Sequence, residues 1–432
     1  MTGGRADIIL SDDVEVPSNS STEAEREKLV DRTGEYSAIL KPEGEIIYLG
    51  TFQSMASIYR GLREKGFGMR LWPARYPLAD KLQSLYADIL APMLMADLAR
   101  DPSLMRPEGS IFGGAPTDER FPDPVLQEKE QLWGPAGFQL QFMLDTSLTD
   151  QNRYPLKTRD LIVMDVPPEV APAKVAWGSS PEVVIKEYVN VGFDGDRIHR
   201  PIFKSSEFVP FTGSVLDIDP SGRGADETAY IVTKFLNGQV FVRAWGGFKD
   251  GHSDDTLRRL AEIAKLHQVN LVRVEANFGD GMFARLLEPK LRAAGYNVPV
   301  EDHKVSGQKE LRIMAVVRPT LEGHRLILDG TVVRDDLALA QAGEGSLERS
   351  GLYQLTHLTT ARGALKHDDR IDVLAMALAY WSERMNASAD EAIAKAEAAE
   401  LREFERKLWD TRINPGASRH NGRPRGTGRR TR

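Results

Sequence analysis

Blocks of apolar and polar residues alternate along the first part of the chain in a way that predicts strands and helices in turn. Two mostly apolar runs, residues 6–10 and 45–49, predict buried strands, and each ends at small or polar residues. Residues 20–32 and 54–65 have helical periodicity instead, and the first of these segments opens with Ser, Thr and Glu. This alternation favours the α/β fold class.

Two later stretches lack a clear period. Residues 103–130 are rich in Pro, Gly and Asp, which predicts a long loop. Residues 167–181 are rich in Pro and Ala, which places a domain boundary between about residues 165 and 210.

The pattern becomes regular from Ser214 onward. An alternating run ends at Asp219, and a turn then leads into a second β-rich run, Thr228–Leu236. Asn237-Gly238 separates this run from a third, Gln239–Trp245, and that dipeptide is typical of a two-residue hairpin. We therefore expect three antiparallel strands at the start of a domain.

The same domain continues with alternating helices and strands. Residues 253–267 predict an amphipathic helix with a Ser/Asp cap, and residues 270–275 predict a strand. A helix over about 281–294 and a strand near 298–301 follow, and residues 368–384 predict a last helix with an apolar stripe. The predicted order is β-β-β-α-β-α-β with a late helix.

Acidic residues end two of these strands and open the last helix. A right-handed crossover would return the fourth strand parallel to the first, so Asp219 and Glu275 should meet at one edge of the sheet. Asp368, Asp369 and Asp372 are spaced three and four positions apart at the helix start, so they share a face. Any one of these acids alone is more often a solvated turn residue or a helix cap, but their joint placement indicates a site.

Such a cluster of acids calls for cations. Cysteine is absent and the eight histidines form no short H-x-x-x-H pair, which argues against a zinc site and leaves Mg²⁺ or Mn²⁺. Carboxylates a few ångströms apart resist joint ionisation, and two divalent ions would relieve this and favour phosphodiester hydrolysis. Asp217 is a weaker alternative to Asp219, and Asp226 is either a supplementary ligand or a turn residue.

Charge is distributed unevenly. The chain has a net charge of −7, and the segment after residue 410 holds seven arginines and no acid, which leaves −14 on residues 1–410. This basic tail would bind nucleic acid or an acidic partner non-specifically, or simply solubilise the chain.

Four segments resemble the large terminase subunits of tailed bacteriophages, in particular the T7-like group: DPSGRGADET (219–228), VEANFGDG (274–281), GQKELRI (307–313) and HDDRID (367–372). The resemblance implies an RNase H-like nuclease domain, a mixed sheet with flanking helices. It also implies a two-metal endonuclease, a hydrolase that cuts concatemeric viral DNA during genome packaging. The implied catalytic residues are Asp219, Glu275, Asp372 and Asp369, with Asp368 and Asp226 as further metal ligands and Lys309 and Arg312 as DNA contacts.

The N-terminal part resembles the later half of the terminase packaging ATPase. Asp12 and Asp13 follow an apolar strand as in a Walker B motif, and Gly50 and Thr51 resemble the coupling motif that comes next. No G-x-x-x-x-G-K-[ST] motif occurs in the 432 residues, so the P-loop (RecA-like) domain is incomplete. We therefore expect no ATPase activity from this chain alone, ATP binding only if the missing half is supplied, and an exposed strand edge or unpaired apolar surface.

The expected domains are a partial ATPase domain (1–165), a connecting region (166–210), the nuclease domain (211–385), and a C-terminal helix with a basic disordered tail (386–432). Expected partners are double-stranded DNA, the phage portal protein and the terminase small subunit. No membrane association is expected, and the predicted location is the host cytoplasm. Two alternatives stay open: another RNase H-like enzyme, such as a junction resolvase or a transposase, and a non-catalytic remnant that binds the portal or the small subunit.

Overall fold

A computed structural model describes most of the chain, namely residues 5–106, 114–193, 195–221, 226–276, 281–343 and 345–385. The described residues up to Leu378 form one compact unit, and those from Ala379 onward belong to a second. The helix and basic tail expected over 386–432 lie outside the described residues.

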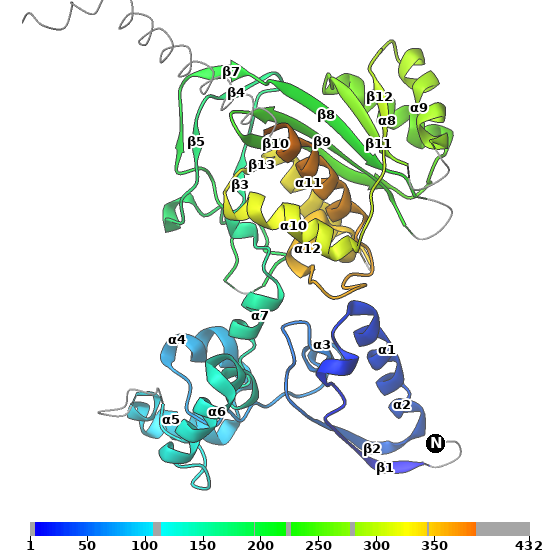
Figure 1. The fold of residues 1–432 in the computed structure, drawn as a ribbon. Helices are drawn as coiled ribbons and strands as arrows, with labels where there is room; N and C mark the ends of the chain where they lie inside the picture. The colour runs from blue at the N-terminus through cyan, green and yellow to red at the C-terminus, as the bar shows by residue number, and fades with distance from the viewer. Residues whose placement is uncertain are drawn as a thin grey trace, which may run out of the picture. The chain divides into compact units, whose positions relative to one another are not determined.

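The N-terminal part contains the predicted strands and helices (Figure 1). Strand β1 (Ala6–Asp12) pairs in parallel with β2 (Leu40–Leu49). Helix α1 (Glu23–Gly34) lies between them in sequence and begins with a capping box, in which Thr22 accepts from the backbone of Glu25. The helices α2 (Tyr36–Ile39) and α3 (Ile58–Glu64) complete this region.

One face of this small sheet exposes apolar side chains. Ile8 and Leu10 of β1 are 63% and 62% exposed, and Leu49 of β2 is 48% exposed. Among the described residues β1 pairs with β2 alone. The unpaired apolar surface expected from the sequence is therefore present.

A helical region follows the first sheet, with helices α4 (Ala79–Lys81), α5 (Pro92–Arg100), α6 (Asp123–Gln141) and α7 (Ser147–Arg153). The prediction of a loop over 103–130 is wrong in its last part, because α6 begins at Asp123. The prediction counted Pro124 as a sign of a loop, because proline breaks the interior of a helix. In the first turn, where Pro124 lies, proline instead favours the start of a helix.

The main sheet has seven strands in the order β12-β11-β8-β9-β10-β13-β3. The bounds are β3 (Ile162–Met164), β8 (Gly213–Asp219), β9 (Thr228–Leu236), β10 (Gln239–Phe248), β11 (Leu271–Glu275), β12 (Val300–His303) and β13 (Leu326–Asp329). The three predicted antiparallel strands are β8, β9 and β10, and β11 lies parallel to β8 as predicted. Asn237 and Gly238 have φ values of 50° and 80°, as a two-residue hairpin requires.

The segment expected to connect two domains has strands of its own. β4 (Val170–Pro172) pairs with β7 (Phe208–Pro210), and β5 (Val175–Ala176) pairs with β6 (Phe203–Lys204). Strand β3, which precedes this segment in sequence, pairs with β13. The main sheet therefore includes a strand that lies before residue 166.

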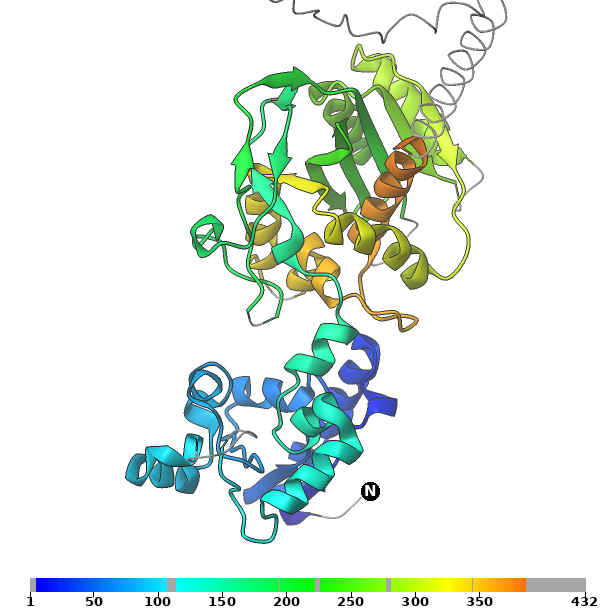
Figure 2. The same cartoon turned by 60° about the vertical axis from the view of Figure 1, so that its left-hand side comes forward.

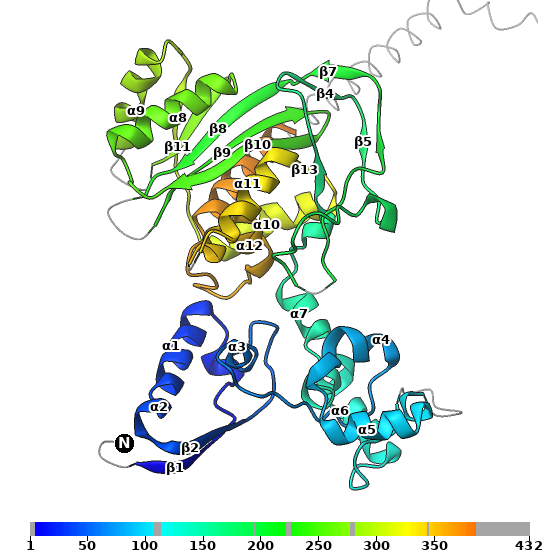
Figure 3. The same cartoon turned by 180° about the vertical axis from the view of Figure 1, so that it is seen from behind.

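Helices cover both faces of the main sheet (Figures 1 and 3). On one face lie α8 (Asp254–Leu266) and α9 (Met282–Ala293), which share a buried core with Leu216 and Ile218 of β8. On the other face lie α10 (Lys309–Glu322), α11 (Gly330–Ala340), α12 (Gly351–His357) and residues 369–378 of the helix over 369–385, drawn in orange in Figure 2. Side chains alternate along a strand, so Asp217 and Asp219 face this second layer.

None of the described helices is long and apolar enough to cross a membrane.

Helix α12 packs against the sheet through a glycine. A Cβ atom at Gly351 would lie 2.6 Å from the ring of Trp245, whose indole nitrogen donates to the backbone oxygen of Arg370. We expect Gly351→Ala to lower the free energy of unfolding by about 1–3 kcal/mol, measured by denaturant unfolding, because the crowded ring must move.

A double-mutant cycle supplies the control for this effect. Trp245→Phe removes the crowded ring atoms, so the cost of Gly351→Ala should be smaller in that background. Equal costs in the two backgrounds would show that the contact does not limit the packing of α12.

Candidate metal centre

Three carboxylates meet at the carboxyl ends of β8 and β11. Asp219 is the last residue of β8, Glu275 is the last residue of β11, and the two strands are adjacent and parallel. Asp372 comes from the first turn of the 369–385 helix. One oxygen from each side chain lies within 4.8 Å of the others, which is the spacing of groups that share a cation. We call Asp219, Glu275 and Asp372 the triad.

Two side chains of the triad are buried, and the third, Asp219, is partly buried. Asp372 is 3% exposed and Glu275 is 9% exposed. Burial raises the pKa of Asp219 well above its ordinary value of 3.8, and the neighbouring Glu275 and Asp372 raise it further. The triad therefore resists full ionisation unless a cation compensates its charge.

Two basic side chains of α10 supply part of that compensation. Lys309 Nζ lies 3.2 Å from Asp372 and 2.6 Å from Asp368, and Arg312 lies 2.7 Å from Asp372. Despite its burial, Lys309 has a raised pKa, because Asp372 and Asp368 favour its charged form. Lys309 and Arg312, expected from the sequence to contact DNA, thus lie at the acids themselves.

Asp217, the weaker alternative to Asp219, has a different environment. It is fully buried, and its carboxylate accepts from the Arg273 guanidinium at 2.8 Å. Burial raises its pKa to about 7, against the lowering effect of Arg273. Arg273 also donates to the backbone oxygen of Met376 at 3.3 Å, so the pair links the sheet to the 369–385 helix.

The remaining candidate acids do not join the triad. Asp226 and Asp369 form a second group with His367, again with one donor atom from each within 4.8 Å of the others. Burial raises the pKa of Asp369 to about 6. Asp368 pairs with Lys309 and belongs to neither group among the described residues.

His367 was not among the site residues predicted from the sequence. No second histidine lies at helical spacing from it, and it reaches its partners through the fold. Its position directly before Asp368-Asp369 was the available signal.

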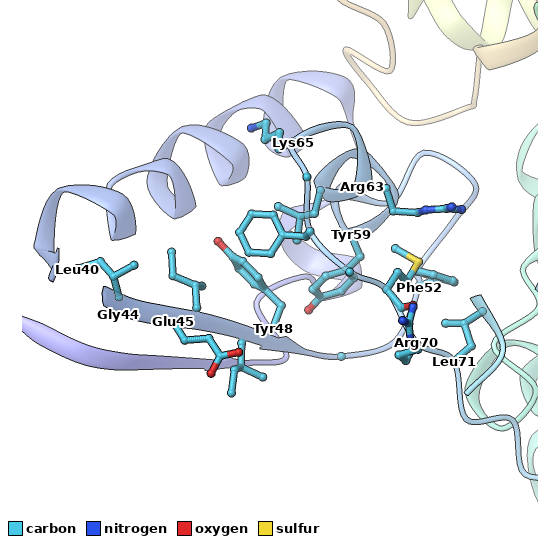
Figure 4. A pocket seen from close by; sticks show the side chains of 18 residues that line it. Leu40, Gly44, Glu45, Tyr48, Phe52, Tyr59, Arg63, Lys65, Arg70 and Leu71 are labelled. Carbon is cyan, nitrogen blue, oxygen red and sulfur yellow. The ribbon is translucent and has the colours of Figure 1, made fainter. Parts of the chain in front are cut away.

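The four residues expected to belong to an ATPase domain also lie close to one another. Asp12 ends β1, Gly50 follows β2, and these strands are parallel neighbours, so both pairs lie at one edge of the small sheet. Gly50 also lines a cavity of about 780 Å³ beside β2. Figure 4 shows the rings of Tyr48 and Tyr59 in this cavity, on the helix side of β2.

The raised pKa of Asp219 gives a pH-dependent stability in the absence of metal. In the folded chain Asp219 keeps its proton to a higher pH than in the unfolded chain, so the folded state binds more protons from about pH 4 up to the raised pKa. The free energy of unfolding therefore falls as pH rises through that window. Asp219→Asn imitates the protonated acid, so in EDTA the variant should gain Tm relative to the wild type between pH 5 and pH 8.

Saturating Mn²⁺ at pH 8 should reverse the order of the two proteins. The wild type then gains stability from the bound ion and the variant gains less. A variant that is less stable than the wild type in EDTA at pH 8 would show that the triad is not under electrostatic strain.

Comparisons with known proteins agree on one family. A family model described as the ribonuclease H-like domain of the bacteriophage T7 terminase matches residues 218–326. The chain is 39% identical to the terminase large subunit of Enterobacteria phage T3 over 410 residues, which are 94% of this chain and 68% of that protein.

Solved structures with lower identity include two viral terminase nucleases. The nuclease domain of the large terminase subunit gp2 of bacterial virus Sf6 is 14% identical, covering 39% of this chain and 88% of that one with a TM-score of 0.29. The Mn-soaked human cytomegalovirus terminase nuclease domain is 15% identical, covering 39% and 82% with a TM-score of 0.29.

The likeness to the T3 protein extends over nearly the whole chain, and the family model includes Asp219, at the end of β8, and Glu275. The chain belongs to the phage terminase large subunit family and carries a T7-type RNase H-like nuclease domain.

Proposed function

We propose that this chain is a metal-dependent endonuclease that cuts viral DNA during genome packaging. The observation that carries the proposal is the triad, three converging carboxylates at the sheet edge of a terminase nuclease domain. The family assignment favours this function over a junction resolvase or a transposase.

The residues at this edge suit phosphodiester hydrolysis. Asp219, Glu275 and Asp372 offer oxygen donors, which Mg²⁺ and Mn²⁺ prefer, and their crowding favours a bound cation. One or two divalent ions held by these carboxylates would supply an activated water and stabilise the charge that develops on the phosphate. Asp369, three positions before Asp372 on the same helix, lies close enough to raise the pKa of Asp219 and would contribute to the field around a second ion.

Lys309 and Arg312 are proposed to contact the DNA backbone once a cation has replaced them at the acids. Both pair with Asp372, so a cation at the triad would release their positive charge towards an incoming phosphate. Double-stranded DNA is thus the proposed substrate, and the portal and the small subunit are proposed partners.

The N-terminal part is proposed to be the later half of the packaging ATPase domain. The support is the parallel pair β1 and β2, which places Asp12, Asp13, Gly50 and Thr51 at the carboxyl edge, where α/β proteins bind ligands.

The direct test of the nuclease is cleavage of plasmid DNA with Mg²⁺ or Mn²⁺. Asp219→Asn should lower the cleavage rate at least about a hundredfold, because a lost ligand removes several kcal/mol of transition-state stabilisation. Asp254→Asn is the matched control, because Asp254 lies on α8, on the opposite face of the sheet. This variant should cleave DNA like the wild type. Equal cleavage by wild type and Asp219→Asn would remove the assignment, and no cleavage by either would favour a non-catalytic remnant.

A second test addresses the competition between Lys309 and metal. Lys309→Met should raise the affinity for Mn²⁺ severalfold in calorimetry, because the acids lose an internal counter-ion, while DNA affinity falls. Lys290→Met, which removes a lysine paired with Asp254 on the other face, should change neither. Unchanged or weaker Mn²⁺ binding by Lys309→Met would show that Lys309 does not compete with the cation.

A further inference from the structure

The donors at the sheet edge divide into two groups that share no residue. The triad is one group, and Asp226, His367 and Asp369 are the other. We propose that this second group is a separate cation site of mixed nitrogen and oxygen donors, which takes a transition-metal dication such as Mn²⁺ or Zn²⁺ in preference to Mg²⁺. This inference does not depend on the chain being a nuclease.

His367 gives the first independent indication of a ligand. The side chain is 9% exposed, and its Nδ1 has no hydrogen-bond partner among the residues that the structure describes. A buried polar atom without a partner costs free energy, and the imidazole of histidine is the commonest protein ligand of metal ions. A ring nitrogen of His367 lies within 4.8 Å of an oxygen of each of the two aspartates, so a cation between them would satisfy all three groups.

The second indication is that the two aspartates are held in place through their chain neighbours. Glu227 follows Asp226, Arg370 follows Asp369, and Arg370 Nε donates to the Glu227 carboxylate at 3.1 Å. Glu227 and Arg370 are 5% and 6% exposed, so this ion pair is buried. In addition, the backbone nitrogen of Glu227 donates to Asp369 Oδ2 at 3.2 Å. The loop end and the helix start are therefore fastened together before any ion binds.

The charge balance also favours a cation. The Glu227 carboxylate is compensated by Arg370 and by Arg349, which lies 3.4 Å from it. Asp369 accepts only a backbone donor among the hydrogen bonds that the described residues make. Asp226 and Asp369 thus bring negative charge to the site, and a dication would neutralise it.

The donor set decides the class of ion. Mg²⁺ prefers an octahedron of oxygens and retains most of its water, whereas Mn²⁺ and Zn²⁺ accept imidazole together with carboxylates. The triad contains oxygen donors only. The two groups should therefore differ in metal preference, which allows one to be filled while the other is masked.

Pulsed EPR of Mn²⁺ added to the full chain in a large excess of Mg²⁺ tests the site. The wild type should show a ¹⁴N coupling from a coordinated imidazole. His367→Gln should lose this coupling, while His252→Gln, which removes a histidine outside the group, should keep it. Asp372→Asn, which empties the triad, should also keep it.

Asp226→Asn provides a second variant with little risk to folding, because Asp226 is exposed. Its Mn²⁺ affinity in excess Mg²⁺ should fall at least about tenfold by calorimetry. Absence of the ¹⁴N coupling in the wild type, or its persistence in folded His367→Gln, would overturn the site. If Mg²⁺-dependent cleavage then still requires Asp219, the proposed nuclease stands and only the second site falls.

Discussion

Repulsion among buried carboxylates is the constraint around which the nuclease domain is arranged. Parallel neighbours β8 and β11 bring Asp219 and Glu275 to one edge, and the 369–385 helix adds Asp372. A single domain must overcome this unfavourable meeting of like charges in order to fold. The elements around the triad offset this repulsion.

Three contacts between the sheet and the helices on this face serve that purpose. Helix α10 carries two cations to Asp372, the buried pair of Asp217 and Arg273 ties the central strands to the 369–385 helix, and Trp245 bonds to the backbone of the same helix. The opposite face of the sheet packs against α8 and α9 through an apolar core. Burial of this apolar surface stabilises the fold.

The sequence was informative wherever one local rule decided the structure. Alternation, caps and the Asn237-Gly238 turn predicted β8 to β12, α8 and α9, and the crossover rule placed Asp219 beside Glu275. The place of β13 between β10 and β3 could not be predicted, because strand order at a distance depends on packing between helices far apart in sequence. The start of α6 was missed because proline has opposite effects at the first turn and in the helix interior.

The site was predicted less completely than the fold for a similar reason. Acids at strand ends are visible in the sequence, and the candidate acids do gather near the sheet edge. Their division into two groups is not visible, because it depends on which way each side chain of one helical turn points. Asp368, Asp369 and Asp372 are neighbours in sequence, yet they face Lys309, His367 and the triad respectively.

The ion pairs of α10 have a consequence for the order in which the site is completed. Because Lys309 and Arg312 already neutralise Asp372, the domain carries its own substitute for a metal ion. These ion pairs predict that the domain folds without divalent ions and binds them afterwards. Small zinc domains differ, because in them the ion is a condition of folding.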